Sequence, residues 1–287
     1  MFRLTVTPLR FLGKHFRAAF RQPREGANMQ VLKDTAKKSP FIYSTYKFVR
    51  DARTVPRARW LRAGQLSDVF KVLPQTMLPM ARLFDAADAV TTVNRERIAG
   101  SIVECGVWNG GCVGLMALAN KRHQGPERKF HLFDSFEGLP QPSQFDTGPR
   151  EEYEKQNPGG ILDDGASKLS AIGACTGLRK DDVSRFLVDQ LGLGKEQFTF
   201  HVGWFQDTVP RAEVGDIAIL RLDGDWYEST KVCLEGLFHK VVSGGYVIVD
   251  DYGTFPGCKR AVDEFFARVG ISPDWQRSDK DCVYFRK

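Results

Sequence analysis

The segment Ser101-Ile-Val-Glu-Cys-Gly-Val107 is a short apolar run that is interrupted by a glycine near its end. Runs of this kind are typical of buried parallel strands, because helices cover both faces of such a sheet. Residues 111–121 follow with a helical pattern, and residues 130–134 form a second apolar run. The order strand, helix, strand predicts that this stretch begins a mostly parallel sheet.

The same alternation continues to the end of the chain. We expect further strands at 198–202, 217–222, 246–250 and 282–285, and helices at 180–191, 228–242 and 259–269. Apolar positions at helical spacing within 61–93 predict more helices that cover the sheet. The pattern therefore predicts an α/β fold with a doubly wound, mostly parallel sheet and helices on both faces. A polar stretch at 141–165 is too long for an ordinary connection and predicts a lid insertion.

Charge is distributed unevenly along the chain. Residues 1–62 hold fifteen Lys or Arg against three acidic residues, whereas residues 63–287 hold 26 basic and 32 acidic residues. We therefore expect a basic N-terminal arm at 1–62 and an acidic domain at 63–287 that does not bind nucleic acid. The arm resembles an amphipathic targeting or membrane-surface segment, and it also suits an extension that packs on the domain or on a partner subunit.

Two further features bear on the class of protein. No uncharged apolar run approaches the ~18 residues of a bilayer-spanning helix, so we expect no integral membrane span. The six cysteines show no CxxC spacing, which favours reduced thiols in a cytoplasmic enzyme over a disulfide framework or a zinc ribbon. We also expect the chain to form a homo-oligomer.

Acidic residues follow four of the expected strands, at Glu104, Asp134, Asp223 to Asp225, and Asp250-Asp251. In doubly wound sheets, ligands bind beyond the carboxyl ends of the strands. Carboxylates that gather at one sheet edge repel each other, so a purely structural protein gains nothing from this arrangement. The carboxyl edge of the sheet is therefore the predicted functional site.

The turn Glu104-x-Gly106-x-x-x-Gly110-Gly111 joins a strand to a helix, and its glycines would let a ligand approach the backbone. It lacks the G-x-G-x-x-G spacing of a dinucleotide site, and an acid precedes the helix. These features favour a positively charged ligand, such as the amino group and sulfonium of S-adenosylmethionine. Asp134 would then accept hydrogen bonds from the ribose hydroxyls, with a loop cap as its alternative role.

Asp223, Asp225, Asp250 and Asp251 end two strands that we expect to be neighbours. Such carboxylates would repel each other unless a cation lies among them, and oxygen-only ligands favour Mg²⁺, with Mn²⁺ or Ca²⁺ as alternatives. In extended backbone, the side chains of Asp223 and Asp225 would point to the same face. The alternative is a set of unrelated loop aspartates.

Five motifs in this order resemble the macrocin-type (mycinamicin/macrocin) sugar O-methyltransferases. They lie at 103–111, 133–140, 203–210, 222–230 and 244–253, and the segment 256–262 follows the last one. The last two have the sequences Leu222-Asp-Gly-Asp-Trp-Tyr-Glu-Ser-Thr230 and Gly244-Gly-Tyr-Val-Ile-Val-Asp-Asp-Tyr-Gly253. The resemblance covers about residues 75–287. It implies a class I, Rossmann-like, seven-stranded fold with an N-terminal helical extension, and methylation of a sugar hydroxyl in a glycosylated natural product or glycan.

The resemblance also implies the cofactors, S-adenosyl-L-methionine and Mg²⁺, and a role for each matching residue. Asp225 would be the general base, and Asp223, Asp250 and Asp251 would bind the metal. The residues implied for the cofactor are Thr76, Met77, Glu104, Gly106, Val107, Gly110, Gly111, Asp134, Ser135, Gly138, Gly203 and Trp204.

Three alternatives remain open at this level. Asp223-Gly-Asp225 has the form of the D-x-D metal motif of glycosyltransferases, although that function would leave Glu104 and the second aspartate pair unused. An aromatic diol satisfies a metal that binds two adjacent oxygens as well as a sugar does. The third alternative is a methyltransferase-like fold that serves as a scaffold.

Overall fold

A computed structural model describes residues 55, 63–146, 161–162, 171–172 and 177–287, all within the unit Lys47–Lys287. The predicted basic arm lies almost wholly outside the described residues. Of the predicted lid, the structure describes residues 141–146 and a two-residue strand at 161–162.

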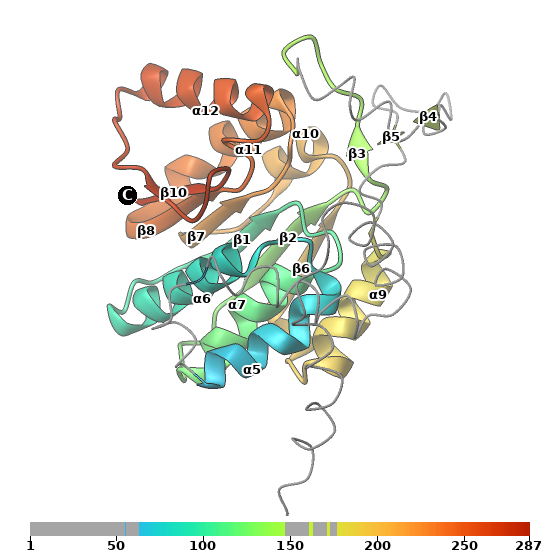
Figure 1. The fold of residues 1–287 in the computed structure, drawn as a ribbon, viewed down its shortest axis with the longest axis vertical. Helices are drawn as coiled ribbons and strands as arrows, with labels where there is room; N and C mark the ends of the chain where they lie inside the picture. Colours follow the sequence, from blue (N-terminus) through green and yellow to red (C-terminus); the bar gives the residue numbers. More distant parts are fainter. Residues whose placement is uncertain (1–54, 56–62, 147–160, 163–170, 173–176) are drawn as a thin grey trace, which may run out of the picture. The chain divides into compact units, whose positions relative to one another are not determined.

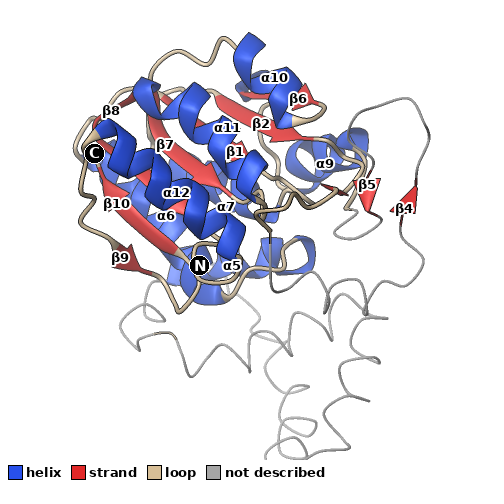
Figure 2. Cartoon of the chain, turned by 90° about the horizontal axis from the view of Figure 1, so that it is seen from above, coloured by secondary structure: helices blue, strands red, loops and turns tan. Residues whose placement is uncertain are grey.

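Seven strands form one sheet in the order β6-β2-β1-β7-β8-β10-β9 (Figure 1; β9 is labelled in Figure 2). Their bounds are β1 Ser101–Cys105, β2 Phe130–Asp134, β6 Phe198–Val202, β7 Ile217–Leu222, β8 Val241–Val249, β9 Gln276–Arg277 and β10 Val283–Arg286. Neighbouring strands are parallel from β6 to β8, whereas β10 runs antiparallel to β8, and β9 to β10. The predicted doubly wound, mostly parallel, seven-stranded sheet is confirmed.

Helices cover both faces of this sheet (Figures 1 and 2). One face carries α5 (Ala63–Val72), α6 (Met80–Arg95), α7 (Gly111–Arg122) and α9 (Lys180–Arg185), which share one apolar core. The other carries α10 (Phe205–Thr208), α11 (Tyr227–Leu237) and α12 (Pro256–Val269), which pack on a second core. Every residue of β1 and β7 is buried, as expected for central strands covered on both faces. None of the described helices combines the length and apolarity that crossing a membrane requires.

The predicted helix at 228–242 ends too late, and the following strand was predicted to begin too late. Helix α11 ends at Leu237, and β8 already begins at Val241. Gly244 has a φ of +80°, and the pairing of β7 with β8 shifts register between Ile217 and Ile219. The glycine lets β8 bend and keep its place in the sheet, so the pair Gly244-Gly245 lies within a strand.

A second small sheet follows β2 in the chain. It joins β3 (Leu139–Pro140), β5 (Ala171–Ile172) and β4 (Ile161–Leu162) in that order, with antiparallel pairing. The sequence pattern predicted an insertion here but no strands.

The five described cysteines are buried and free, as expected for reduced thiols: Cys105, Cys112, Cys233, Cys258 and Cys282.

Gly106 brings the ends of β1 and β7 together. Its φ is +90°, and a Cβ atom placed on it would lie 1.8 Å from the carbonyl oxygen of Asp223. The hydrogen bond from the Asp223 N–H to the Cys105 carbonyl, 2.8 Å long, lies at the same junction. The sequence predicted a close approach of a ligand at this glycine, and the structure shows a close approach of the neighbouring strand end.

We expect Gly106→Ala to destabilise the fold more than Gly192→Ala does. Gly192 also has a positive φ, +63°, but nothing lies within 4 Å of its Cβ position, so it reports conformational strain alone. That strain costs about 1–2 kcal/mol, and Gly106→Ala adds a backbone clash to it. Urea unfolding of the two variants measures the difference, and equal losses would contradict this account of the junction.

Candidate active site

A cleft lies at the carboxyl ends of β1, β2, β7 and β8, and we call it the main cleft. It is lined by the strand-end loops and by residues 75–79 together with Arg82. An adjoining cavity shares Gly106, Asp134 and Gly138 with the main cleft and extends to residues 203–206. Both cavities lie where ligands bind in doubly wound sheets.

The structure brings together almost all of the residues predicted for the site. Asp225 and the three predicted metal ligands line the main cleft. So do the cofactor-site residues Thr76, Met77, Glu104, Gly106, Val107, Gly111, Asp134 and Gly138. The adjoining cavity adds Ser135, Gly203 and Trp204.

Gly110 lines neither of these two cavities. It precedes α7 with a φ of +81°, and a Cβ atom there would lie 2.8 Å from Cγ1 of Val183. The structure therefore explains this glycine by the turn into α7 and the packing of α9 against it, and its role toward a cofactor stays a prediction.

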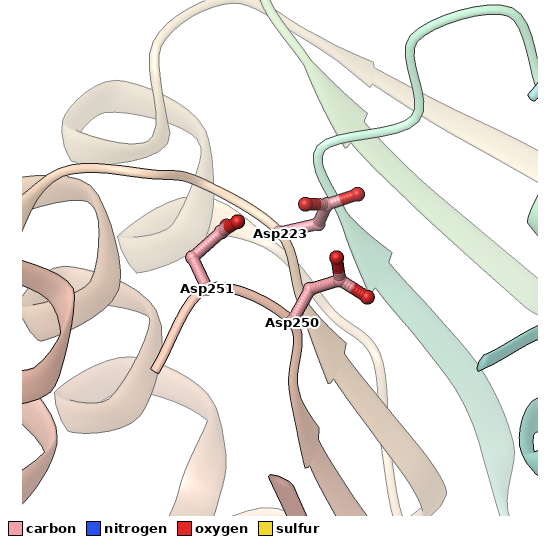
Figure 3. A group of neighbouring side chains, drawn as sticks. All are labelled: Asp223, Asp250 and Asp251. Atoms are coloured by element: carbon pink, nitrogen blue, oxygen red, sulfur yellow. The ribbon is translucent and has the colours of Figure 1, made fainter. Parts of the chain in front are cut away.

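Three carboxylates converge at the ends of β7 and β8. One oxygen each of Asp223, Asp250 and Asp251 lies within 4.8 Å of the others, and Figure 3 shows the three side chains. Asp223 follows β7, and the other two follow β8, its parallel neighbour, with Leu222 opposite Val249. The expectation that these aspartates are neighbours is confirmed.

Asp225 differs from the expected extended geometry. Its φ is +59°, and its backbone N–H donates to Oδ2 of Asp251 at 3.2 Å. The prediction that extended backbone places the side chains of Asp223 and Asp225 on one face was therefore wrong. Asp225 lines the main cleft because the chain turns sharply before α11.

Arg221 is a buried cation among these carboxylates. Its Nη1 donates to Oε1 of Glu104 and to Oδ2 of Asp223, both at 2.9 Å, and its Nη2 donates to Oδ1 of Asp250 at 2.6 Å. Only 2 % of the residue is exposed. One guanidinium therefore joins the carboxylates of three adjacent strands, β1, β7 and β8.

Arg82 of α6 reaches the same cluster from the other side. Its Nη1 donates to Oδ2 of Asp250, so both carboxylate oxygens of Asp250 pair with an arginine. Its Nε and Nη2 bind Asp279 at 2.7 Å and Asp281 at 3.2 Å, in the loop before β10. Arg82 thereby links α6, the end of β8 and the C-terminal loop.

The lining of the main cleft remains strongly negative. Six carboxyl groups and two guanidinium groups line it, a formal charge of −4. Burial raises the pKa of Glu104 to about 7 against the opposing effect of Arg221. Burial and neighbouring carboxylates also raise the pKa values of Asp225 and Asp251 well above the ordinary aspartate range. Further positive charge in the cleft would stabilise these carboxylates.

Glu104 also carries an orphaned acceptor. Its Oε2 is buried and has no hydrogen-bond partner in the described part of the chain, apart from the nearby Cys112 thiol, a weak donor. A buried carboxylate oxygen without a partner is costly, and Glu104 lines the main cleft. The arrangement fits a ligand that brings a positively charged donor.

Asp134 stabilises the turn after β1. Its Oδ2 accepts the backbone N–H groups of Val107 at 2.7 Å and Trp108 at 3.0 Å, and its Oδ1 accepts that of Phe136 at 2.7 Å. The carboxylate thus acts as a loop cap, the alternative role considered for it. Its lining of both cavities is compatible with binding ribose as well, and that role stays a prediction.

Comparison with known proteins agrees with this geometry. The chain matches the model of the Macrocin-O-methyltransferase (TylF) family over residues 17–287. The chain belongs to this family. The match extends the resemblance beyond the predicted 75–287 into the arm, and membership makes the chain an O-methyltransferase.

Two curated relatives show how far the similarity extends along the chain. The demethyldecarbamoylnovobiocin O-methyltransferase of Streptomyces niveus is 36% identical over 212 residues, 74% of this chain and 75% of the relative. The mycinamicin III 3''-O-methyltransferase of Micromonospora griseorubida is 30% identical over 260 residues, 90% of this chain and 95% of the relative.

Solved structures support the fold. The O-methyltransferase NovP is similar with a TM-score of 0.63 at 35% identity, over 74% of this chain and 82% of NovP. CalS11, a calicheamicin methyltransferase, is similar with a TM-score of 0.58 at 17% identity, over 92% of this chain and 98% of that one, which bears on the fold alone.

Sequence reasoning missed both arginines of the main cleft, Arg82 and Arg221. Arg221 did carry a signal, because it interrupts the apolar run Ile217–Leu222, and a charge in a central strand must be paired. Arg82 carried no comparable local signal, since its partners lie at least 168 positions away in the chain.

We expect Arg221→Met to lower the free energy of unfolding by about 3–5 kcal/mol, because it leaves buried carboxylates without their cation. Urea unfolding measures this loss, which should shrink as the pH falls and the stranded carboxylates take up protons. The matched control is Arg268→Met, whose partner Glu235 is exposed and whose loss should change stability little. Similar losses in the two variants would contradict a central role for Arg221.

Proposed function

We propose that this chain transfers the methyl group of S-adenosyl-L-methionine to a sugar hydroxyl of a glycosylated natural product, with Mg²⁺ bound at the aspartate cluster. The observation that carries the proposal is the convergence of Asp223, Asp250 and Asp251 beside the glycine turn in a chain of the Macrocin-O-methyltransferase (TylF) family. Because that family is one of O-methyltransferases, we no longer consider the glycosyltransferase and scaffold alternatives.

The residues of the main cleft fit S-adenosylmethionine on two grounds. The buried Oε2 of Glu104, which has no donor near it stronger than the Cys112 thiol, suits the ammonium group of a methionine moiety. The adjoining cavity, with Ser135 and Trp204, suits the flat adenine and its ribose. Thr76 and Met77 would close the cofactor site from the segment before α6.

The aspartate cluster fits a hard divalent cation. Its donors are carboxylate oxygens only, and the cleft keeps a formal charge of −4 after both arginines are counted. Bound there, Mg²⁺ would act as a Lewis acid that lowers the pKa of an acceptor hydroxyl. Arg221 and Arg82 would hold Asp223 and Asp250 in place.

Asp225 is the proposed general base. A sugar hydroxyl is a poor nucleophile at neutral pH, so a nearby carboxylate that accepts its proton assists the transfer. Asp225 lines the main cleft beside the cluster, and desolvation and the neighbouring carboxylates raise the pKa of its carboxyl group.

The names of the relatives support a sugar as the acceptor. One is the 8-demethyl-8-(2,3-dimethoxy-alpha-L-rhamnosyl)-tetracenomycin-C 4'-O-methyltransferase of Streptomyces olivaceus, 34% identical over 211 residues. We therefore propose a deoxysugar glycoside as acceptor, and an aromatic diol is the alternative outcome of the test. A homo-oligomeric state and a cytoplasmic location are also proposals.

The first test is metal dependence of methyl transfer. With a panel of L-rhamnosides that carry free vicinal hydroxyls, activity should disappear after exhaustive EDTA treatment and return with Mg²⁺, because without the cation the acceptor hydroxyl keeps its high pKa. Mass spectrometry of the products measures the transfer. Undiminished activity without a divalent cation would refute the metal site, and methylation of catechols alone would favour the aromatic alternative.

The second test separates the base from the metal ligands. Asp225→Asn keeps the shape but removes the basic oxygen, so kcat should fall by ~10²–10⁴ while the apparent Mg²⁺ affinity stays within a few fold. Asp223→Asn should lose both together. A near-normal kcat in Asp225→Asn would show that another group takes the proton.

A further inference from the structure

The first turn of α11 is capped from a distant part of the chain. The cap residue Trp226 makes no capping bond with its own side chain, and the Tyr227 N–H donates to Oδ1 of Asp146 at 2.8 Å. These residues lie 81 positions apart. A carboxylate at a helix N-terminus satisfies a backbone donor and interacts favourably with the helix dipole.

The Asp146 carboxylate is itself held firmly. Its Oδ2 accepts both the backbone N–H and the hydroxyl of Ser143 at 2.8 Å, and only 4 % of Asp146 is exposed. The first turn of α12 packs against it, since a Cβ atom on Gly257 would lie 1.9 Å from Oδ1. Asp146 therefore joins the start of the insertion to two helices.

A second bond ties the same two segments together. The indole Nε1 of Trp226 donates to the carbonyl oxygen of Pro140 at 3.0 Å. Residues 226 and 227, which directly follow Asp225, are thus both bound to the segment 140–146.

Asp225 depends on its surroundings for its conformation. A φ of +59° is unfavourable for a residue other than glycine, and such a conformation persists only where neighbouring contacts impose it. Before Asp225, Gly106 fixes the strand end at Asp223, and the N–H of Asp225 itself donates to Oδ2 of Asp251. After it, Trp226 and Tyr227 are bound to the segment 140–146.

We propose that Asp146 is a positioning residue that caps α11 and thereby holds the backbone of Asp225 in its left-handed conformation. The inference rests on the proposed role of Asp225 as the base. It assigns a function in catalysis to the first residues of the insertion, which touch neither Glu104 nor the aspartate cluster through any bond in the described residues.

Hydrogen–deuterium exchange of the full chain tests this positioning without an acceptor. In Asp146→Ala, peptides that cover residues 223–230 should exchange faster, while those that cover β1 and β8 keep their wild-type rates. The matched control is Glu264→Gln, because Glu264 accepts a bond from the hydroxyl of the same Tyr227 at 2.6 Å and leaves its backbone N–H untouched. Should the alanine variant fail to fold, Asp146→Asn, which keeps one oxygen for that N–H, should show a smaller change of the same kind.

Kinetics test the consequence. With an L-rhamnoside that the wild type methylates, Asp146→Ala should lower kcat roughly tenfold or more, with S-adenosylhomocysteine affinity by calorimetry within twofold of wild type. In an Asp225→Asn background, the same change should lower kcat no further, because the two residues act through one group.

The outcomes are distinct. Three results would each overturn the proposal. The first is unchanged exchange at 223–230, and the second is faster exchange throughout the chain. The third is a fall in kcat on Asp146→Ala that is as large in the Asp225→Asn background as in the wild type. A normal kcat in Asp225→Asn alone would instead refute the proposed base, and the exchange result would still report on the positioning.

Discussion

The buried guanidinium of Arg221 is the interaction on which the rest of the site depends. It joins Glu104, Asp223 and Asp250 across three adjacent strands, with nitrogen–oxygen distances of 2.6–2.9 Å. Burying a charge is expensive, and the cost is offset only because several carboxylates share the cation with good geometry. The carboxyl edge of the sheet can therefore hold acidic side chains close together without unfolding. Arg82 extends the same principle to the C-terminal loop.

The two arginines neutralise the carboxylates of the main cleft only in part, and the negative charge that remains favours the binding of positively charged ligands. The main cleft keeps an excess of negative charge, an unpartnered oxygen on Glu104 and raised carboxyl pKa values. An ammonium or sulfonium group at one end and a divalent cation at the other would each relieve this excess. The proposed cofactor and metal would thus meet the same electrostatic need in one cleft, at the ends of strands whose carboxylates Arg221 joins.

Much of the fold and the site followed from local sequence patterns. Apolar runs gave the central strands because buried parallel strands need apolar residues on both faces, and the strand-end acids Glu104, Asp134, Asp223 and Asp250 followed from the topology. The ion pairs of Arg221 and Arg82 and the cap that Asp146 places on α11 could not be predicted in this way. Except for the Arg221–Asp223 pair, these contacts join residues that lie between 29 and 199 positions apart, so no local pattern indicates them. The left-handed backbone of Asp225 and the early start of β8 also follow from tertiary contacts rather than from residue type.

The central claim is that the aspartate cluster, held by Arg221, binds one divalent cation per chain. Calorimetric titration of Mg²⁺ into the metal-free protein, with S-adenosylhomocysteine present, tests it most directly. The account predicts one bound ion per chain in the wild type and in Asp189→Asn, a control at an exposed carboxylate outside the cluster, and no binding in Asp223→Asn. Absence of Mg²⁺ binding to the wild type, or equal binding to Asp223→Asn, would contradict it.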